Sequence, residues 1–223
     1  PSHVLDGDLP RSAWFDKPRA RLLSASDGQL HTVVPGRPIG LHPDCVAALG
    51  GQGIHLHFYG DFTQGQWRDW IETSRKLAPE HLHLHANVDQ ANWVHEFSRY
   101  DAGWLHAFES KNQGELRRAD WDDLNYPARM ATLACAGLPM IQRANPDASV
   151  ATQSLTQRLG LGVFFESLDQ LGHLLRDRAS MDQVRARVWQ ERGQFTFDRH
   201  APALLGFFRA VIEHAGRNHT LPA

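Results

Sequence analysis

The sequence lacks the features that would assign it to several large classes of protein. Its 223 residues include only two cysteines, and no apolar run approaches the roughly 20 residues that span a bilayer. The first residues do not have the pattern of a signal peptide, and we expect none. The formal net charge of −2 at pH 7 offers no concentrated basic face for a phosphate backbone. We therefore expect a cytoplasmic protein that has no transmembrane segment and does not bind nucleic acid.

The short motifs of several enzyme classes are also missing. The sequence contains no Gly-x-Ser-x-Gly nucleophile elbow, no Walker phosphate loop, and no Cys-x-x-Cys or His-Glu-x-x-His metal motif. The glycine-rich residues 50–53 precede a predicted strand, whereas a dinucleotide-binding loop follows one. A serine hydrolase, a P-loop enzyme and an NAD enzyme are therefore weak candidates.

Histidines recur at a spacing of two residues in two predicted strands. His55 and His57 share one face of the first strand, and His81, His83 and His85 share one face of the second. A metal site needs three or four convergent ligands with supporting partners. Because the histidines alternate with apolar residues, packing or hydrogen bonding on a sheet face is the simpler interpretation, and we expect no metal.

The composition is that of an ordinary globular domain, with 42% hydrophobic and 22% charged residues. Cys45 and Cys135 lie in small-residue helical contexts, which favours buried free thiols over a disulfide. The chain starts at Pro1 rather than at methionine. We therefore expect it to be part of a longer protein.

Predicted strands and helices alternate along most of the chain. Apolar runs bounded by turn residues predict strands at residues 30–34, 54–59, 81–86, 102–107, 138–141 and 162–165. Periodic segments predict helices at residues 43–49, 64–77, 90–97, 150–159 and 168–176, with another after residue 125. Strands separated by helices imply parallel pairing with right-handed crossovers. We predict an α/β fold: a doubly wound, mostly parallel Rossmann-like sheet with helices on both faces.

The chain divides into three predicted parts. Residues 1–27 contain several prolines and little periodicity, so they form an irregular lead-in or interdomain linker. Residues 28–178 form the Rossmann-like domain. Residues 179–223 add closing C-terminal helices at residues 181–190 and 201–215.

Residues 125–141 are the most informative segment, because they predict a helix start, a helix stop and a strand in one run. Asn125 can cap the helix, and Pro127 fits its first turn, where a missing N–H has no cost. Gly137 ends the helix before the strand begins. Such a junction in an open α/β sheet favours a phosphate, through unpaired N–H groups and the helix dipole. Arg129 would add a cation in the first turn.

This segment resembles the sugar-nucleotide half of glycosyltransferases with two Rossmann domains, the GT-B type, and in particular the group 1 or family 4-like enzymes. Many of them have a proline, any residue, Lys or Arg, Leu or Met, and then a small-residue helix that ends Ala-x-Gly-x-Pro. Pro127, Arg129, Met130, residues 135–137 and Pro139 match that pattern without a gap. The resemblance implies that the chain binds a nucleoside diphosphate sugar.

Two carboxylates of the family pattern are replaced in this chain. Thr132 stands where members commonly have a glutamate that contacts the donor ribose. Leu124 stands at the first position of the family's Glu-x7-Glu pair, and the nearest substitute is Asp123.

The resemblance also implies donor contacts elsewhere. Gly36 would allow close backbone approach, and Arg37 would reach the donor diphosphate. Gly60 would form a tight turn beside the ligand, and backbone groups at Val88 would read the nucleobase. The ordinary alternatives are a surface arginine and plain turn chemistry.

A polar loop after the strand that ends near His106 completes the predicted site, since α/β sites form at such strand ends. A solvated loop is the alternative interpretation. The predicted substrate-binding residues are Gly36, Gly60, Val88, His106, Glu109, Asn112, Asp123, Asn125, Tyr126, Pro127 and Thr132.

We therefore predict the donor-binding half of a hexosyltransferase-type enzyme of carbohydrate metabolism, for example in polysaccharide biosynthesis. Arg37, Arg129 and helix N–H groups would stabilise the leaving diphosphate without a metal or other cofactor. The acceptor would need a missing N-terminal domain and could lie at a membrane surface. Arg129 could instead form a surface salt bridge.

Two other functions stay open. The departures at Thr132 and Leu124 fit a non-catalytic nucleotide-sugar-binding or scaffold domain. The architecture also fits a sugar-nucleotide epimerase. An epimerase needs acid-base carboxylates or histidines at the sugar, whereas a transferase needs chiefly leaving-group stabilisation.

Overall fold

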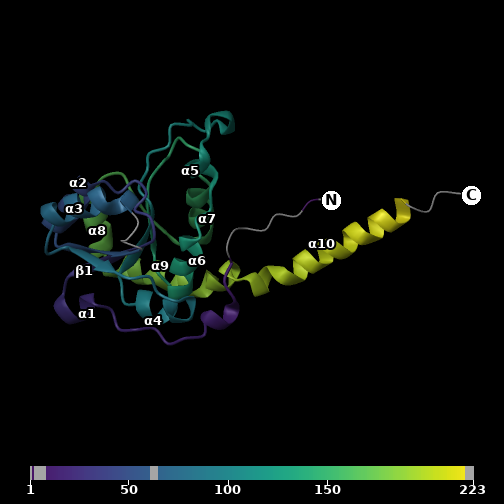
Figure 1. Cartoon of the computed structure of the whole chain (residues 1–223), viewed down its shortest axis with the longest axis horizontal. Helices are drawn as coiled ribbons and strands as arrows, with labels where there is room; N and C mark the ends of the chain where they lie inside the picture. Colours follow the sequence, from purple (N-terminus) through teal and green to yellow (C-terminus); the bar gives the residue numbers. More distant parts are fainter. Residues whose placement is uncertain (1, 3–8, 61–64, 219–223) are drawn as a thin grey trace, which may run out of the picture.

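The computed structural model describes residues 2, 9–60 and 65–218, and their central feature is a parallel sheet (Figure 1). In this part of the chain six strands pair in the order β3-β2-β1-β4-β5-β6, and every pairing is parallel. The strands are β1 (Leu30–Pro35), β2 (Ile54–Tyr59), β3 (Leu82–His85), β4 (Ala102–His106), β5 (Met140–Arg143) and β6 (Gly162–Phe165). The order reverses between β1 and β4, as in Rossmann folds, and confirms the predicted fold class.

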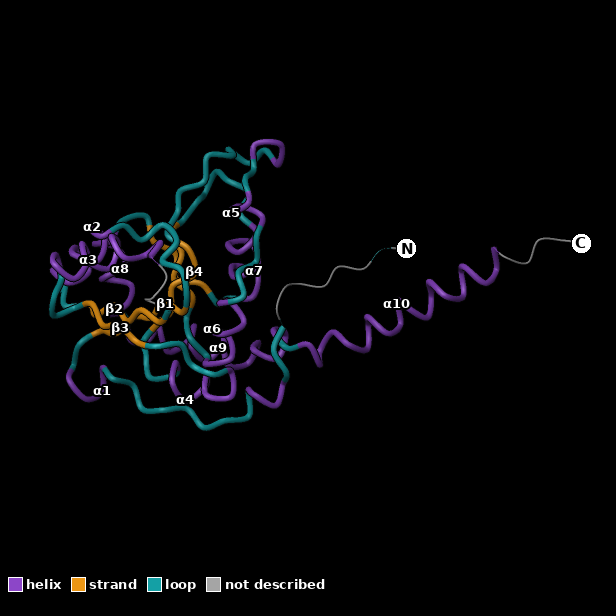
Figure 2. Tube along the Cα trace, in the orientation of Figure 1, coloured by secondary structure: helices purple, strands orange, loops and turns teal. Residues whose placement is uncertain are grey.

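Helices cover both faces of the sheet (Figure 2). They are α1 (Ser24–Asp27), α2 (Pro43–Gly51), α3 (Arg68–Leu77), α4 (Trp93–Phe97), α5 (Trp121–Leu124), α6 (Arg129–Ala136), α7 (Ala151–Leu159), α8 (Leu168–Arg176), α9 (Arg178–Glu191) and α10 (Phe197–Asn218). One hydrophobic core joins the sheet to α2, α3 and α8, and a second joins it to α4, α6 and the C-terminal part of α9.

All eight residues of α6 are buried, which makes this helix the centre of the second core. Gly103 in β4 lets α6 lie close to the sheet, because a Cβ at that position would be 2.2 Å from Cδ2 of Leu133. Gly137 ends the helix in the left-handed conformation at φ 71°, as the sequence predicts.

The start of α6 differs from the prediction. The helix begins at Arg129 with Ala128 at its N-cap and no side-chain cap, so the expectation that Asn125 caps it is wrong. Asn125 instead ends α5, a short helix that the sequence did not predict. Asp120 and Asp123 form a capping box at the start of α5, and this local bonding separates the two helices.

The described part of the lead-in, residues 9–27, lies against the body of the molecule and is bonded to it. The backbone N–H of Leu23 donates to the carbonyl oxygen of Arg99 at 2.9 Å, and the N–H of Ala20 donates to Oγ of Ser98 at 2.8 Å. At the other end of the chain, α10 extends away from the body (Figure 1). None of the described helices is both long and apolar enough to cross a bilayer.

Candidate functional site

A cavity of about 970 Å³ opens beside the carboxyl ends of β1 and β2. It lies next to the point where the strand order reverses, which is where open α/β sheets bind ligands. Its described lining residues are Leu9, Pro10, Arg11, Trp14, Pro35, Gly36, Tyr59, Asn87, Val88, Gln90, Trp93, Phe97, Ala128, Arg129, Thr132 and Phe197.

The described lining combines positive charge with aromatic surface. Arg11 and Arg129 contribute the charge, and Asp, Glu and His are absent from this set. Five lining residues are aromatic: Trp14, Tyr59, Trp93, Phe97 and Phe197. Arginines bind phosphate and carboxylate groups, and aromatic side chains offer flat apolar surface. The lining therefore suits a ligand that has both an anionic group and an aromatic ring.

Arg129 is a buried cation on the cavity wall, with 9% of its surface exposed. Its guanidinium donates to the backbone carbonyl oxygens of Leu105 and Arg37, and no carboxylate in the described part of the chain pairs with it. Burial, with a smaller contribution from the charge of Arg37, lowers the pKa of Arg129 to about 10. The group therefore stays charged at neutral pH. A ligand anion in the cavity would supply the counter-charge that a buried cation requires.

Arg37 occupies the loop between β1 and α2. Gly36 has a φ of 95°, and its N–H donates to the carbonyl oxygen of Tyr59 at 2.8 Å. This turn leaves the Arg37 side chain exposed, without a hydrogen bond or ion pair to the described residues. The guanidinium of Arg129 donates to the backbone carbonyl oxygen of Arg37. The two predicted arginines are therefore linked through the main chain of Arg37.

His106 ends β4, is absent from the described lining and is 5% exposed. Its ring centroid is 5.2 Å from that of Phe108, and its Nδ1 has no hydrogen-bond partner within the described structure. Burial, followed by the charges of Arg129 and Arg37, lowers the pKa of His106 to about 4. The imidazole is therefore neutral at pH 7.

The structure brings together part of the predicted site. The predicted residues on the cavity lining are Gly36, Val88, Arg129 and Thr132. Tyr126 and Pro127 line a smaller cavity of about 180 Å³, which shares Leu9 and Ala128 with the first. Gly60 closes β2, where its N–H donates to the carbonyl oxygen of His85 at 3.2 Å.

Other predicted residues make contacts within the protein and are not on the described lining. Glu109 pairs with Arg143 at 3.2 Å. Asn112 is fully buried, and its side chain bonds backbone groups of residues 114 and 149. Asp123 belongs to the capping box of α5.

Sequence reasoning missed the wall that carries Arg11, Trp14 and Trp93. The rings of Trp14 and Trp93 meet edge to face, with centroids 6.4 Å apart. Trp93 Nε1 donates to the carbonyl oxygen of Val88 at 3.2 Å, so one acceptor at the predicted nucleobase position already has a partner. No local pattern relates these segments, because the lead-in approaches α4 only in the folded chain.

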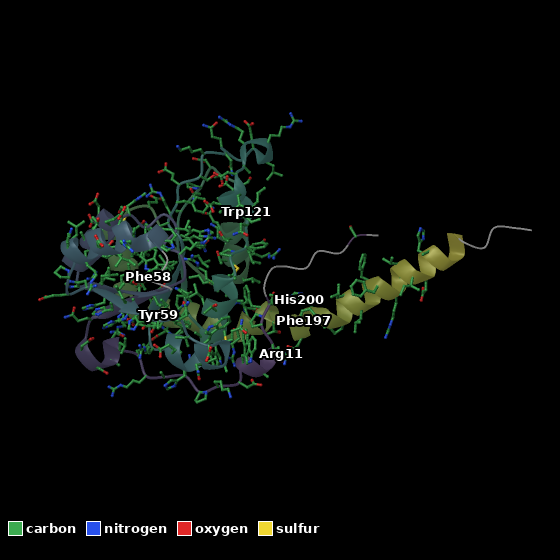
Figure 3. The ribbon with its side chains drawn as sticks, viewed as in Figure 1. Arg11, Phe58, Tyr59, Trp121, Phe197 and His200 are labelled. Carbon is green, nitrogen blue, oxygen red and sulfur yellow. The ribbon has the colours of Figure 1, made fainter. Side chains whose placement is uncertain are left out.

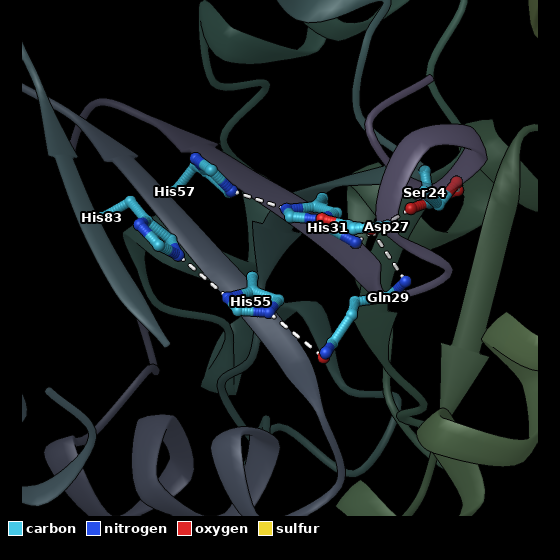
Figure 4. A network of polar contacts seen from close by, with 8 residues as sticks. Ser24, Asp27, Gln29, His31, His55, His57 and His83 are labelled. Atoms are coloured by element: carbon cyan, nitrogen blue, oxygen red, sulfur yellow. Dashed lines mark hydrogen bonds and ion pairs between the residues drawn. The ribbon is translucent and has the colours of Figure 1, made fainter. Parts of the chain in front are cut away.

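The histidines that share sheet faces form hydrogen-bonded rows together with His31 (Figure 4). Contacts of 2.9 Å between ring nitrogens join His31 to His57, His57 to His85, and His55 to His83. Asp27 lies 2.9 Å from Nε2 of His31. Because a carboxylate can only accept, we infer that His31 carries its proton on Nε2, and the same assignment follows for His57 and His85.

At least two members of these rows, His57 and His83, are neutral imidazoles at pH 7. Burial, followed by the charges of neighbouring histidines, lowers the pKa of His57 to about 2 and that of His83 to about 4. Several of the rings also stack, for example His57 on His83 with centroids 4.4 Å apart. No group of three or more His, Cys, Asp or Glu in the described ranges could hold a metal ion.

Comparisons with known proteins give similarities of fold. No protein-family model and no curated protein matches the chain. The C-terminal CMP-Kdo-binding domain of WaaA from Acinetobacter baumannii is 8% identical, over 73% of this chain and 88% of its own, with a TM-score of 0.46. TarM is 8% identical, over 79% of this chain and 34% of its own, with a TM-score of 0.43.

A third similar structure is that of accessory secretory protein 1, 2 and 3 in Streptococcus pneumoniae. It is 12% identical, over 86% of this chain and 37% of its own, with a TM-score of 0.46.

Proposed function

We propose that this chain binds a nucleoside diphosphate sugar in the cavity and is the donor-binding domain of a glycosyltransferase. The observation that carries this proposal is Arg129, a cavity-lining residue whose buried, charged side chain has no carboxylate partner among the described residues. A diphosphate would neutralise it, and the aromatic wall would accept the nucleobase.

The same residues suit the chemistry of transfer. When an acceptor oxygen attacks the anomeric carbon, the bond from that carbon to the diphosphate oxygen breaks and the diphosphate gains charge. Arg129 is already fixed by two carbonyl oxygens, so it can stabilise this charge with little reorganisation. The exposed Arg37 side chain, on the loop that Arg129 binds, would add a second contact.

The lining favours transfer or simple binding over epimerisation. Proton abstraction at a sugar carbon needs a general base, and the described lining has no Asp, Glu or His. Tyr59 is the one phenol in that set, and its hydroxyl is engaged by Glu96 and by Tyr100. Burial raises the pKa of Tyr59 well above its usual range.

A second domain would hold the acceptor. Helix α10 projects from the body with an apolar side that has no cover in the described structure: Leu205, Phe208 and Ile212 are 54%, 49% and 70% exposed. An acceptor-binding domain seated beside the cavity would bury such a surface. The chain alone should then bind donor without glycosylating an acceptor.

Calorimetric titration with nucleoside diphosphates of each base tests the proposal, with the matching nucleosides as phosphate-free controls. We expect diphosphates to bind and nucleosides to bind far more weakly. The sugar nucleotide of the preferred base is then incubated with the chain, with and without acceptors. Epimer formation would replace the transferase proposal, and no binding of any diphosphate at millimolar concentration would refute it.

A further inference from the structure

We infer that Arg11 is a further anion-binding residue of the cavity, besides Arg129 and Arg37, and that it binds a different anionic group of the ligand from the one at Arg129. The inference rests on the proposed function for the identity of the ligand, but its central claim concerns charge alone. Arg11 comes from the lead-in, whereas Arg129 comes from α6, so the two cations enter the cavity on separate segments.

The segment that carries Arg11 is fixed in place on both sides of that residue. The carbonyl oxygen of Pro10 accepts from the N–H of Phe197 at 3.0 Å, and the N–H of Ser12 donates to Oδ2 of Asp198 at 2.6 Å. Arg11 and Phe197 lie together where α10 leaves the body (Figure 3). All of these bonds use backbone N–H or C=O groups of the lead-in, so the Arg11 side chain is not needed to hold the wall.

The Arg11 guanidinium is available to a ligand. It forms no ion pair or side-chain hydrogen bond with the described residues, and it is exposed to solvent. A neighbouring acid in the described structure is Asp198, whose pKa is lowered first by the hydrogen bond from the Ser12 backbone and least by the charge of Arg11. The Asp198 carboxylate accepts the hydrogen bond from the Ser12 backbone N–H, so it is already engaged by the backbone.

Two arginines on separate walls, with no carboxylate on the described lining, select a ligand that has two anionic groups. In a sugar nucleotide the second group is either the second phosphate or a carboxylate on the sugar. A nucleoside monophosphate has only one such group, so it should gain little from Arg11.

Titration of the wild-type chain and of Arg11→Gln distinguishes the second phosphate from the sugar carboxylate as the group that Arg11 binds. The ligands are a nucleoside monophosphate, the diphosphate, a diphosphate linked to a neutral sugar, one linked to a uronic acid, and inorganic pyrophosphate. Arg11→Gln should lower the affinity for the diphosphate by about tenfold or more if Arg11 binds the second phosphate. If the loss appears only with the uronic acid, Arg11 binds the sugar carboxylate.

The exposed Arg117→Gln is the matched control, since it removes the same charge from a residue outside the described lining. Arg11→Lys should retain part of the affinity, because it keeps the charge but loses the planar fork. An unchanged affinity for every ligand in Arg11→Gln, or an equal loss for monophosphate and diphosphate, would overturn the inference.

The outcomes also distinguish this inference from the proposed function. If nucleotides bind and Arg11→Gln changes nothing, the function stands and the role of Arg11 is wrong. If only pyrophosphate binds, and binds less to Arg11→Gln, the anion site stands and the nucleotide proposal fails. If neither nucleotides nor pyrophosphate bind, both proposals fail.

Discussion

The guanidinium of Arg129 donates a hydrogen bond to the backbone carbonyl oxygen of Arg37, and so links the start of α6 to the loop after β1. A second bond, to the carbonyl oxygen of Leu105 at 3.4 Å, links it to β4. One buried cation therefore joins three segments: α6, the loop after β1, and β4. We therefore expect the two arginines of the predicted site to differ in their effects on stability.

Replacement of Arg129 by alanine should lower the free energy of unfolding by about 1–3 kcal/mol, because two carbonyl oxygens lose a charged donor in a buried setting. Arg37→Ala should change it by less than about 0.5 kcal/mol, since the side chain is exposed and without a partner among the described residues. Urea unfolding of both variants measures the difference. Equal stabilities would show that Arg129 does not hold the three segments together.

Arg37→Ala should nevertheless weaken diphosphate binding by about 1–3 kcal/mol, the scale of a hydrogen bond to a charged group. Calorimetry with the nucleoside diphosphate of the preferred base measures it, and Arg117→Ala controls for the loss of one positive charge. A dissociation constant that matches wild type would make Arg37 an ordinary surface residue.

Diphosphate binding should not require a divalent metal. The proposed contacts are arginine side chains and the start of α6, and no described group of acidic or histidine side chains could hold a metal ion. Titrations in the presence of a chelator should give the same affinity as titrations with magnesium or manganese. Binding that disappears in chelator and returns with metal would contradict the arginine contacts.

Gly40→Ala should destabilise the chain by more than about 2 kcal/mol and weaken ligand binding. Gly40 has a φ of 75°, and a Cβ there would lie 2.5 Å from backbone atoms of Ala107 and Phe108. The loop from β1 would have to move off the end of β4. Gly51→Ala is the control, because a Cβ there meets nothing within 4 Å, and its stability should equal or exceed wild type. Thermal unfolding of both variants decides the comparison.

Stability should fall as the pH drops from about 6.5 toward 4. The pKa values of His57 and His83 are lowered from 6.5 to about 2 and about 4, so below pH 6.5 the unfolded chain takes up protons that the folded chain does not. Above pH 6.5 both states are neutral at these residues and the penalty disappears. Urea midpoints at several pH values measure the slope.

The variant His57→Gln should flatten that pH dependence, whereas His173→Gln, at an exposed position on α8, should leave it unchanged. A wild-type stability that is constant between pH 7.5 and 5 would show that the histidine rows accept protons freely.

The sequence predicted the sheet because strand and helix periodicities are local properties of a chain. Strand β2 could be predicted from its apolar run, and the end of α6 from its glycine, each from only a few neighbouring residues. The structure confirms both. The same local reasoning placed Asn125 at the wrong helix end. A capping box between Asp120 and Asp123 starts a separate short helix, α5, and Asn125 lies at the end of that helix. Competing local hydrogen bonds of this kind are hard to rank from sequence.

The sequence by itself determined which segments form strands and helices. It also indicated that Gly36, Val88, Arg129 and Thr132 would come together near one edge of the sheet, because parallel strands end at the same edge. Only the tertiary structure decided that Arg129 is buried without a carboxylate partner among the described residues, and that the lead-in completes the cavity. Ser12 and Asp198 are 186 residues apart, and their hydrogen bond brings Arg11 to the site. Contacts over such separations form through packing of the whole fold, so no local pattern contains them.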